Sequence, residues 1–241
     1  MRHRVFFSIT GLLLVIVPHI VPSSRLGPAT DPAVLSATRG VAADTVPRNG
    51  DRPRIVAFGN SLTAGLGVPR EQTYPALLEQ RLESMGYQYR VINAGVSGDT
   101  TAGGLRRVPW ILKSLPALVI LELGANDGLR GLSLEQTKAN LDAIIRLLQE
   151  ARVTVVLAGM KLPPNYGQNY TRGFEALYAD LARRYGLVLI PFFLDGVAAN
   201  PALNQSDGIH PTGEGYKRIV ETVLTRIEPL LSKPPPRPGP P

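Results

Sequence analysis

The fold is most constrained by a regular alternation of short apolar runs and longer helical stretches. Continuous apolar character, with turn residues after each run, is typical of strands buried on both faces, as in a parallel sheet. Such runs predict strands at Arg54–Phe58, Gln88–Asn93, Leu118–Leu123, Thr154–Gly159 and Leu187–Ile190. The stretches after them predict helices at Gln72–Met85, Thr101–Lys113, Leu134–Ala151, Arg172–Tyr185 and Gly213–Leu231. The alternation predicts an α/β domain, a three-layer α/β/α sandwich around a five-stranded parallel sheet with right-handed crossovers.

The N-terminal segment has the composition of a targeting signal. Basic residues within 2–4 precede an apolar run over 5–17, which is the pattern of an export signal. The run is shorter than the about 20 residues that a membrane-spanning helix needs. Residues 1–21 therefore predict a signal peptide or, if uncleaved, a membrane anchor. We expect an exported protein, periplasmic or extracellular, with this apolar segment as its one candidate membrane tether.

Composition also sets the domain boundaries. A segment rich in Pro, Ser, Ala, Thr and Gly precedes the first predicted strand and is typical of a linker. The last residues are mostly proline, which is typical of a polyproline or disordered tail. We expect a flexible linker at 22–53, one folded domain at 54–232 and a Pro-rich tail at 233–241.

The rarity of two residue types excludes several chemistries. Cysteine is absent, which removes a thiol nucleophile, disulfides and thiolate metal sites. Histidine occurs only at His3, His19 and His210, and the first two lie in the predicted signal. One histidine cannot supply the usual ligands of a zinc hydrolase, and no glycine-rich phosphate loop follows a strand. We therefore expect neither a metal nor a cofactor, and any imidazole chemistry of the domain must use His210.

The net charge of +7 suggests nucleic-acid binding only at first sight. Much of the excess lies in the flanks, where Arg2, Arg4 and Arg25 have no acidic neighbours. Within the predicted domain no dense basic stripe with interleaved aromatic residues occurs. We therefore expect no nucleic-acid partner.

Small and polar residues follow the first three predicted strands. Ser61 lies in a strand-to-helix turn, where its hydroxyl and its backbone N–H can face the same space. Gly95 can bring a backbone N–H close to a ligand because it has no side chain. Asn126 offers a neutral amide donor, which suits an oxyanion hole. Because the carboxyl ends of parallel strands meet at one edge of a sheet, we expect these three residues to lie close together.

The last polar segment precedes the final helix and contains the only histidine of the domain. Asp207 lies three residues before His210 and can fold back onto the imidazole Nδ1. A carboxylate there would hold the tautomer and stabilise the imidazolium that forms when Nε2 takes a serine proton. Pro211 is expected to open the helix that follows. The four segments together could supply a nucleophile, a base, an orienting acid and oxyanion donors.

The segments resemble the four blocks of the SGNH (GDSL) hydrolase family, in its bacterial thioesterase I/lysophospholipase L1 and arylesterase branch. They are Phe58–Gly65, Asn93–Thr100, Gly124–Asp127 and Asp207–His210, and the resemblance covers about residues 54–228. It implies a flavodoxin-like sheet, with Ser61 as the nucleophile, His210 as the base and Asp207 as the orienting acid. It also implies an oxyanion hole formed by the backbone N–H groups of Ser61 and Gly95 and the side chain of Asn126.

One position departs from the family pattern. The family's first block usually reads G-D-S-L, whereas this chain has Asn60 before Ser61. Because the catalytic acid lies in the last block, we expect activity to survive. The hydrogen bonding and the charge beside Ser61 should differ from those of the family.

The resemblance predicts a serine acyl-ester hydrolase of the arylesterase, acyl thioesterase or lysophospholipase type. It would form an acyl-enzyme from a small-molecule or lipid ester, and we expect it to be a monomer. Two alternatives stay open, a carbohydrate O-deacetylase on the same fold and a non-catalytic envelope-binding protein. A two-carboxylate glycosidase would leave Asn126 and His210 without a role. Candidates for the acyl pocket are Leu62, Leu66, Val96, Trp110 and the loop Lys161–Tyr170.

Overall fold

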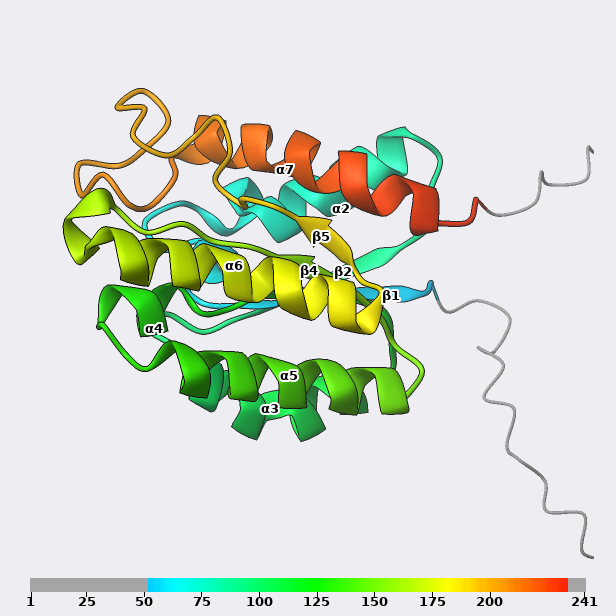
Figure 1. Cartoon of the computed structure of the whole chain (residues 1–241). Coiled ribbons are helices and arrows are strands. Elements are labelled where there is room, and N and C mark those ends of the chain that lie inside the picture. Colours follow the sequence, from blue (N-terminus) through cyan, green and yellow to red (C-terminus); the bar gives the residue numbers. More distant parts are fainter. Residues whose placement is uncertain (1–51, 234–241) are drawn as a thin grey trace, which may run out of the picture. The chain divides into compact units, whose positions relative to one another are not determined.

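The computed structural model describes residues 52–233, which form a parallel sheet covered by helices on both faces (Figure 1). The predicted signal, the tail beyond residue 233 and almost all of the predicted linker lie outside the described residues. The strands are β1 (Arg54–Gly59), β2 (Arg90–Gly95), β3 (Pro116–Glu122), β4 (Thr154–Ala158) and β5 (Val188–Ile190). Their spatial order is β2-β1-β3-β4-β5, and every neighbouring pair is parallel. This is the flavodoxin-like order, so the predicted fold class is confirmed.

Five long helices make the two outer layers (Figure 1). On one face lie α2 (Tyr74–Ser84) and α7 (Gly213–Ile227), and on the other α3 (Thr101–Lys113), α5 (Leu134–Glu150) and α6 (Gln168–Tyr185). The short elements are α1 (Ser61–Ala64), α4 (Ala125–Leu129), and the 3₁₀ turns η1 (Arg70–Gln72), η2 (Pro164–Tyr166) and η3 (Glu228–Leu230).

Three predicted helix starts differ from the structure. Helix α2 begins at Tyr74, two residues after the predicted Gln72, because Thr73 has an extended backbone. Helix α6 begins four residues before the predicted Arg172, because Gly167 at φ 85° separates it from the turn η2. Pro211 does not open α7. It pairs with Asn204 in an isolated bridge, and Thr212 caps the helix by accepting the Gly215 N–H at 3.2 Å.

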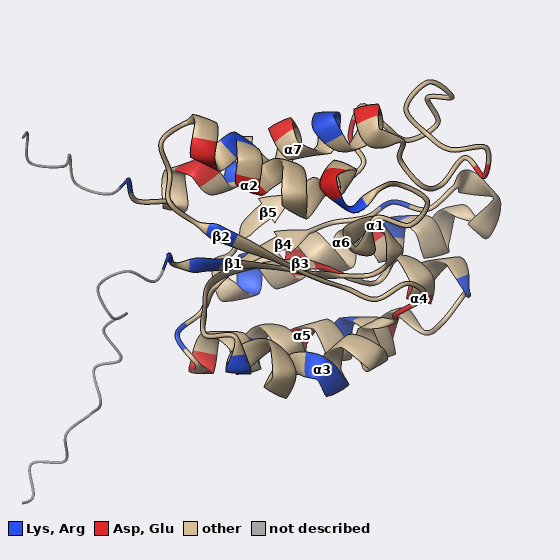
Figure 2. Ribbon diagram, turned by 180° about the vertical axis from the view of Figure 1, so that it is seen from behind, with Lys and Arg blue, Asp and Glu red and all other residues tan. Residues whose placement is uncertain are grey.

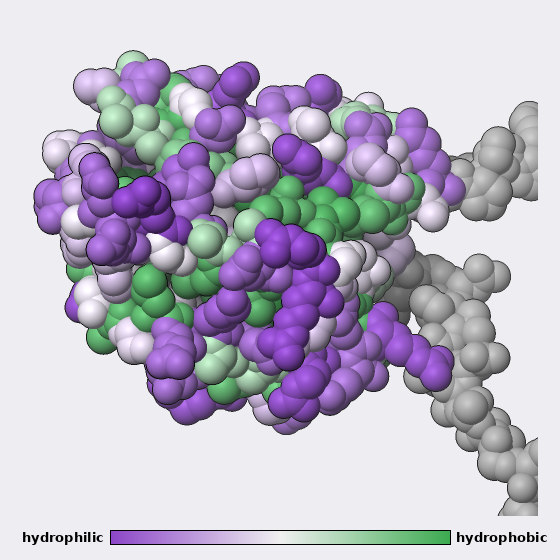
Figure 3. All heavy atoms as spheres, in the orientation of Figure 1, coloured by the Kyte–Doolittle hydropathy of each residue, from purple (hydrophilic) through white to green (hydrophobic). Residues whose placement is uncertain are grey.

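The core lies between the sheet and its two helical layers. The inner strands are buried on both faces; Val119, Ile120 and Leu121 of β3 have no exposed surface. The edge strand β5 is less covered, and Figure 3 shows a band of apolar atoms between α6 and α7 where this strand runs. Figure 2 shows charged residues of both signs interspersed over the outer helices α2 and α7. Among residues 52–233, no helix is long and apolar enough to cross a membrane.

The sheet brings the predicted blocks to one edge. The carboxyl ends of the strands lie at the left of Figure 1, beside α4 and below the long loop between β5 and α7. The first three blocks follow β1, β2 and β3, and the last block lies in that long loop. This edge therefore carries the candidate site.

Candidate active site

A continuous hydrogen-bonded chain joins three of the predicted site residues. Ser61 is the first residue of α1, directly after β1, and its Oγ lies 2.9 Å from His210 Nε2. The other imidazole nitrogen, Nδ1, lies 2.6 Å from Asp207 Oδ2. A serine with a base on one side and a carboxylate behind that base has the geometry of an activated nucleophile.

The carboxylate of Asp207 is held by its own loop. Its Oδ1 accepts the backbone N–H groups of Ile209 at 2.8 Å and His210 at 2.9 Å. The His210 backbone N–H, the His210 ring and the Ile209 N–H together lower the pKa of Asp207 to about 2. Asp207 therefore stays ionised at any ordinary pH and faces Nδ1 as an acceptor.

Gln205 fastens this loop to the turn Asn60–Gly65, which carries Ser61 and is called the nucleophile turn after the role predicted for that serine. Its backbone N–H donates to the carbonyl of His210 at 2.7 Å, and its side-chain Nε2 donates to the carbonyls of Leu66 at 2.7 Å and Pro211 at 3.0 Å. Because Leu66 follows α1, these contacts fix the imidazole relative to Ser61. Gln205 was not among the site residues predicted from the sequence.

Asn60 caps the nucleophile turn from inside the protein. Its Oδ1 accepts the Leu62 N–H at 2.9 Å, and its Nδ2 donates to Glu122 Oε1 at 2.8 Å. The side chain is buried, and both ends of its carboxamide are occupied. The asparagine at position 60, where the family usually has aspartate, therefore affects the hydrogen bonding of Glu122 directly.

Glu122 ends β3 and has no exposed surface. Its Oε2 accepts the Thr63 hydroxyl at 2.9 Å and, more weakly, the Asn60 backbone N–H at 3.4 Å. Burial raises the pKa of Glu122 to about 7, although the donors from Thr63 and Asn60 act in the opposite direction. Glu122 was not among the residues predicted from the sequence, although a lone acid at the end of an apolar strand is an unusual pattern.

Gly59 is required by the same close packing. A Cβ at this position would overlap Thr63 Oγ1 and the Glu122 carboxylate. The glycine before the nucleophile turn therefore lets α1 and β3 approach each other.

Two of the three predicted oxyanion donors are free to serve. Asn126 lies in α4, and its Nδ2 donates one hydrogen to the Asp99 carbonyl at 2.9 Å, which leaves the second amide hydrogen. Within residues 52–233, the backbone N–H of Ser61 has no hydrogen-bond partner.

The third predicted donor, Gly95, is already engaged. Its N–H donates to Asn93 Oδ1 at 3.0 Å, and a Cβ there would overlap the backbone of Ala64. The glycine is the last residue of β2 and pairs with Gly59 in the sheet. Gly98, three residues later at φ 79°, has an N–H without a partner in the described part of the chain. It also precedes Asp99, whose carbonyl Asn126 contacts.

Arg107 joins the loops that carry these donors. From α3 its guanidinium binds Asp99 Oδ2 at 2.6 and 2.9 Å, the Ala94 carbonyl at 3.0 Å and the Gly59 carbonyl at 3.2 Å. It thereby ties the ends of β1 and β2 to the loop before α3. The sequence analysis did not identify this arginine.

The residues predicted for the acyl pocket separate into three groups. Leu62 is buried in the core, and Trp110 is exposed near the end of α3, which runs away from the site edge. Leu66 is exposed beside the nucleophile turn, and Val96 is exposed in the loop between β2 and α3 that also carries Gly98. Ile209, which was not predicted for the pocket, is exposed next to His210 in sequence. The predicted loop is tied down, since Tyr166 and Tyr170 donate to the carbonyls of Leu129 at 2.9 Å and Leu132 at 2.6 Å.

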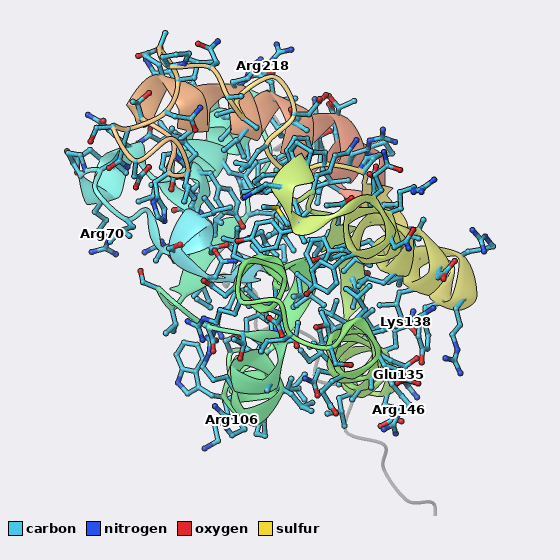
Figure 4. The ribbon with its side chains drawn as sticks, turned by 60° about the vertical axis from the view of Figure 1, so that its left-hand side comes forward. Arg70, Arg106, Glu135, Lys138, Arg146 and Arg218 are labelled. Atoms are coloured by element: carbon cyan, nitrogen blue, oxygen red, sulfur yellow. The ribbon has the colours of Figure 1, made fainter. Side chains whose placement is uncertain are left out.

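Arg130 approaches the site, since its guanidinium donates to the Gly98 carbonyl at 3.0 Å, whereas several other charged side chains point away from it. Figure 4 shows six such side chains directed outward from the rim, namely Arg70, Arg106, Glu135, Lys138, Arg146 and Arg218. In the described residues, no group of three or more His, Asp or Glu side chains is arranged to hold a metal ion.

Comparison with known proteins decides the family. The model of the GDSL-like lipase/acylhydrolase family matches residues 57–218. The chain belongs to this family. Esterase TesA from Pseudomonas aeruginosa is 43% identical over 178 residues, which are 73% of this chain and 89% of that protein.

Two further relatives agree. Thioesterase 1/protease 1/lysophospholipase L1 of Escherichia coli K12 is 36% identical over 200 residues, 83% of this chain and 90% of that protein. The crystal structure of the psychrotrophic esterase EstA from Pseudoalteromonas sp., inhibited by monoethylphosphonate, superposes with a TM-score of 0.70 at 31% identity. That match covers 73% of this chain and 97% of the solved one. The chain is a serine acyl-ester hydrolase of the GDSL family.

Proposed function

We propose that Ser61 is the nucleophile, His210 the general base and Asp207 the group that orients and stabilises the imidazole. The observation that carries this assignment is the chain from Ser61 Oγ through His210 to Asp207, with links of 2.9 and 2.6 Å. Both distances are within the reach that proton transfer needs.

In the first half-reaction Ser61 Oγ attacks the ester carbonyl carbon while its proton passes to His210 Nε2. The tetrahedral intermediate collapses, and the leaving alcohol or thiol takes that proton. Water then attacks the acyl-enzyme by the same route and releases the acid. Asp207 stabilises the imidazolium in both halves and remains a carboxylate, since its pKa is low.

The oxyanion hole in this proposal uses Ser61, Asn126 and Gly98. The free N–H of Gly98, beside the Asp99 carbonyl that Asn126 contacts, supports it as the third donor. The hydrogen bond between Gly95 and Asn93 argues against Gly95 in that role. Donors fixed before the reaction stabilise the developing oxyanion most.

The substrates we propose are short- to medium-chain esters, acyl thioesters and lysophospholipids. The exposed apolar side chains of Leu66, Val96 and Ile209 around the site support an acyl chain as the bound group. The names of the two curated relatives support the same classes. Acetylated sugars remain the rival substrate class.

We also propose that residues 1–21 direct export of the enzyme. The basic start and the apolar run over 5–17 support an export signal. Cell fractionation with N-terminal sequencing tests this, because a processed N-terminus in the exported fraction is expected. A full-length chain in the membrane fraction would instead indicate an anchor.

Pre-steady-state kinetics with a p-nitrophenyl ester test the mechanism. A burst of p-nitrophenol with an amplitude close to the enzyme concentration is expected when deacylation is the slower step. Nucleophilic hydroxylamine should speed turnover and yield the hydroxamate. Acetylated sugars, acyl thioesters and lysophospholipids, compared by kcat/KM, then separate the substrate classes. A wild-type enzyme that hydrolyses these esters but gives neither a burst nor a hydroxamate with any of them would contradict the proposal.

A further inference from the structure

A buried polar cluster lies beneath the nucleophile turn. At its centre is the Glu122 carboxylate, which accepts three hydrogens, from Asn60 Nδ2 at 2.8 Å, Thr63 Oγ1 at 2.9 Å and the Asn60 backbone N–H at 3.4 Å. The two donor residues stand on either side of Ser61 in sequence. The carboxylate is therefore hydrogen-bonded to the turn at the residue before Ser61 and at the second residue after it.

The Asn60 carboxamide links the Glu122 carboxylate to the backbone N–H of Leu62. Its Oδ1 accepts the Leu62 N–H at 2.9 Å while its Nδ2 stays on Glu122. The N–H groups on either side of Ser61 thus have partners inside the protein, and the Ser61 N–H has none in the described residues. This arrangement leaves the Ser61 N–H available on the side of the substrate.

No ion pair accounts for Glu122. Among residues 52–233, no Lys or Arg pairs with it, and its charge helps to raise the pKa of three buried tyrosines, Tyr74 of α2, Tyr178 of α6 and Tyr216 of α7. A buried carboxylate without a cationic partner is costly for folding. Its hydrogen bonds all lead to the turn that carries Ser61.

We propose that Glu122 is the positioning residue of the nucleophile turn, and that Asn60 is matched to it so that the carboxamide–carboxylate pair holds Ser61 Oγ in line with His210. The inference rests on the proposed role of Ser61 as nucleophile. Glu122 touches neither substrate nor the reacting atoms, so it acts through Asn60 and Thr63.

Hydrogen-bond polarity makes the pair testable. In Glu122→Gln, one oxygen acceptor becomes an NH2 donor. If the glutamine oxygen stays on Asn60 Nδ2, its NH2 faces Thr63 Oγ1 and the Asn60 backbone N–H; the Thr63 hydroxyl must then accept, and the backbone N–H loses its acceptor. If the glutamine is turned the other way, its NH2 faces the Asn60 amide, donor against donor, unless Asn60 also turns over and Leu62 loses its acceptor. The double variant Asn60→Asp/Glu122→Gln reverses the polarity and satisfies every group. The glutamine amide donates to the new carboxylate at position 60, and the glutamine oxygen accepts from Thr63. The other oxygen of the new carboxylate still accepts the Leu62 N–H.

The single variant Asn60→Asp gives a second readout. Two buried carboxylates in contact must share one proton to keep a hydrogen bond between them. The variant should work while the pair holds that proton and should lose activity at alkaline pH, where wild type does not. The double variant has a single carboxylate and should lack this alkaline loss.

The experiment measures kcat, KM and the pH profile of the four full-length enzymes on a p-nitrophenyl ester. Glu122→Gln should lower kcat roughly 10- to 100-fold with little change in KM, because misalignment near the nucleophile acts on the reaction step. The double variant should recover to within a few-fold of wild type. Ile145→Val, at a buried position of α5 outside the polar cluster, controls for lost stability and should keep the wild-type profile.

The outcomes separate the two claims. A Glu122→Gln enzyme with wild-type kcat and pH profile, or a double variant no better than the worse single, would overturn the positioning role. Wild-type enzyme that forms no acyl adduct on Ser61 would instead contradict the proposed function. Thr63→Ser should behave as wild type and Thr63→Val as a weaker Glu122→Gln; two equally active Thr63 variants would also count against the proposal.

Discussion

The two sides of the catalytic centre hold carboxylates in opposite environments. On the base loop, Asp207 has 44% of its side chain exposed and accepts two backbone N–H groups, and its pKa falls to about 2. Beneath the nucleophile turn, Glu122 is fully buried, and desolvation raises its pKa to about 7. The ionised Asp207 faces His210, which carries positive charge in the proposed mechanism. The buried Glu122 faces neutral donors and, in our proposal, positions the nucleophile turn.

The largest expected effect tests whether the two sides act as one unit. Ser61→Ala should lower kcat by several orders of magnitude with the fold intact, and adding His210→Ala should cost little more, because neither residue works without the other. Steady-state rates with single and double variants check this. A double variant that loses far more than the worse single would mean that the two sides contribute independently.

A smaller effect is expected at Asn126, which belongs to neither side. Asn126→Ala should lower kcat by roughly 10²–10³ with little change in KM, because its amide acts on charge that develops in the transition state. Michaelis parameters on one ester are sufficient. If only KM changes, Asn126 binds the ground-state substrate and is no oxyanion donor.

The buried carboxylate should make stability depend on pH in an unusual direction. The pKa of Glu122 is raised in the folded state, so folding is favoured by its protonated form, and stability is lost as pH rises from about 4.5 through about 7. Glu122→Gln should remove this loss, on the order of 3 kcal/mol across that window. Denaturant unfolding of both proteins at pH 5 and pH 8 measures it. Parallel pH dependences would contradict a buried, titrating Glu122.

The exposed carboxylate should show the opposite sign and a smaller size. The pKa of Asp207 is lowered in the folded state, so its contribution is present above about 3.8 and is lost as pH falls through about 2. Because solvent screens an exposed group, Asp207→Asn should change stability little at neutral pH and lessen the acid sensitivity. Acid unfolding curves of the two proteins compare directly; a gain in stability at neutral pH would show that Asp207 is strained.

The sequence predicted the sheet well because buried strands have a strong local signal. The second strand was placed at Gln88–Asn93, but its pairing with the distant strand β1 carries it to Gly95. The loop interpretation of Gly95 left its N–H free for a ligand. Asn93, only two residues earlier, accepts that N–H, a local contact that asparagine side chains often make.

The site residues likewise differ in how far their contacts could be predicted from the sequence. Asp207 and His210 are three residues apart on one loop, and His210 is the domain's only histidine, so their contact was predictable. Glu122 and Asn60 are far apart in sequence and meet only when β1 and β3 pair. Arg107 and Gln205 act on backbone carbonyls, which carry no mark in the sequence.

The most direct test of the central claim is the location of a covalent phosphonate adduct. The enzyme is treated with a fluorophosphonate, digested and analysed by peptide mass spectrometry. One adduct per chain is expected, on Ser61, because only a serine activated by His210 reacts at neutral pH. Ser61→Ala should remain unlabelled, and Asn126→Ala should be labelled more slowly. An adduct on another residue, or none on an enzyme that hydrolyses esters, would contradict the account.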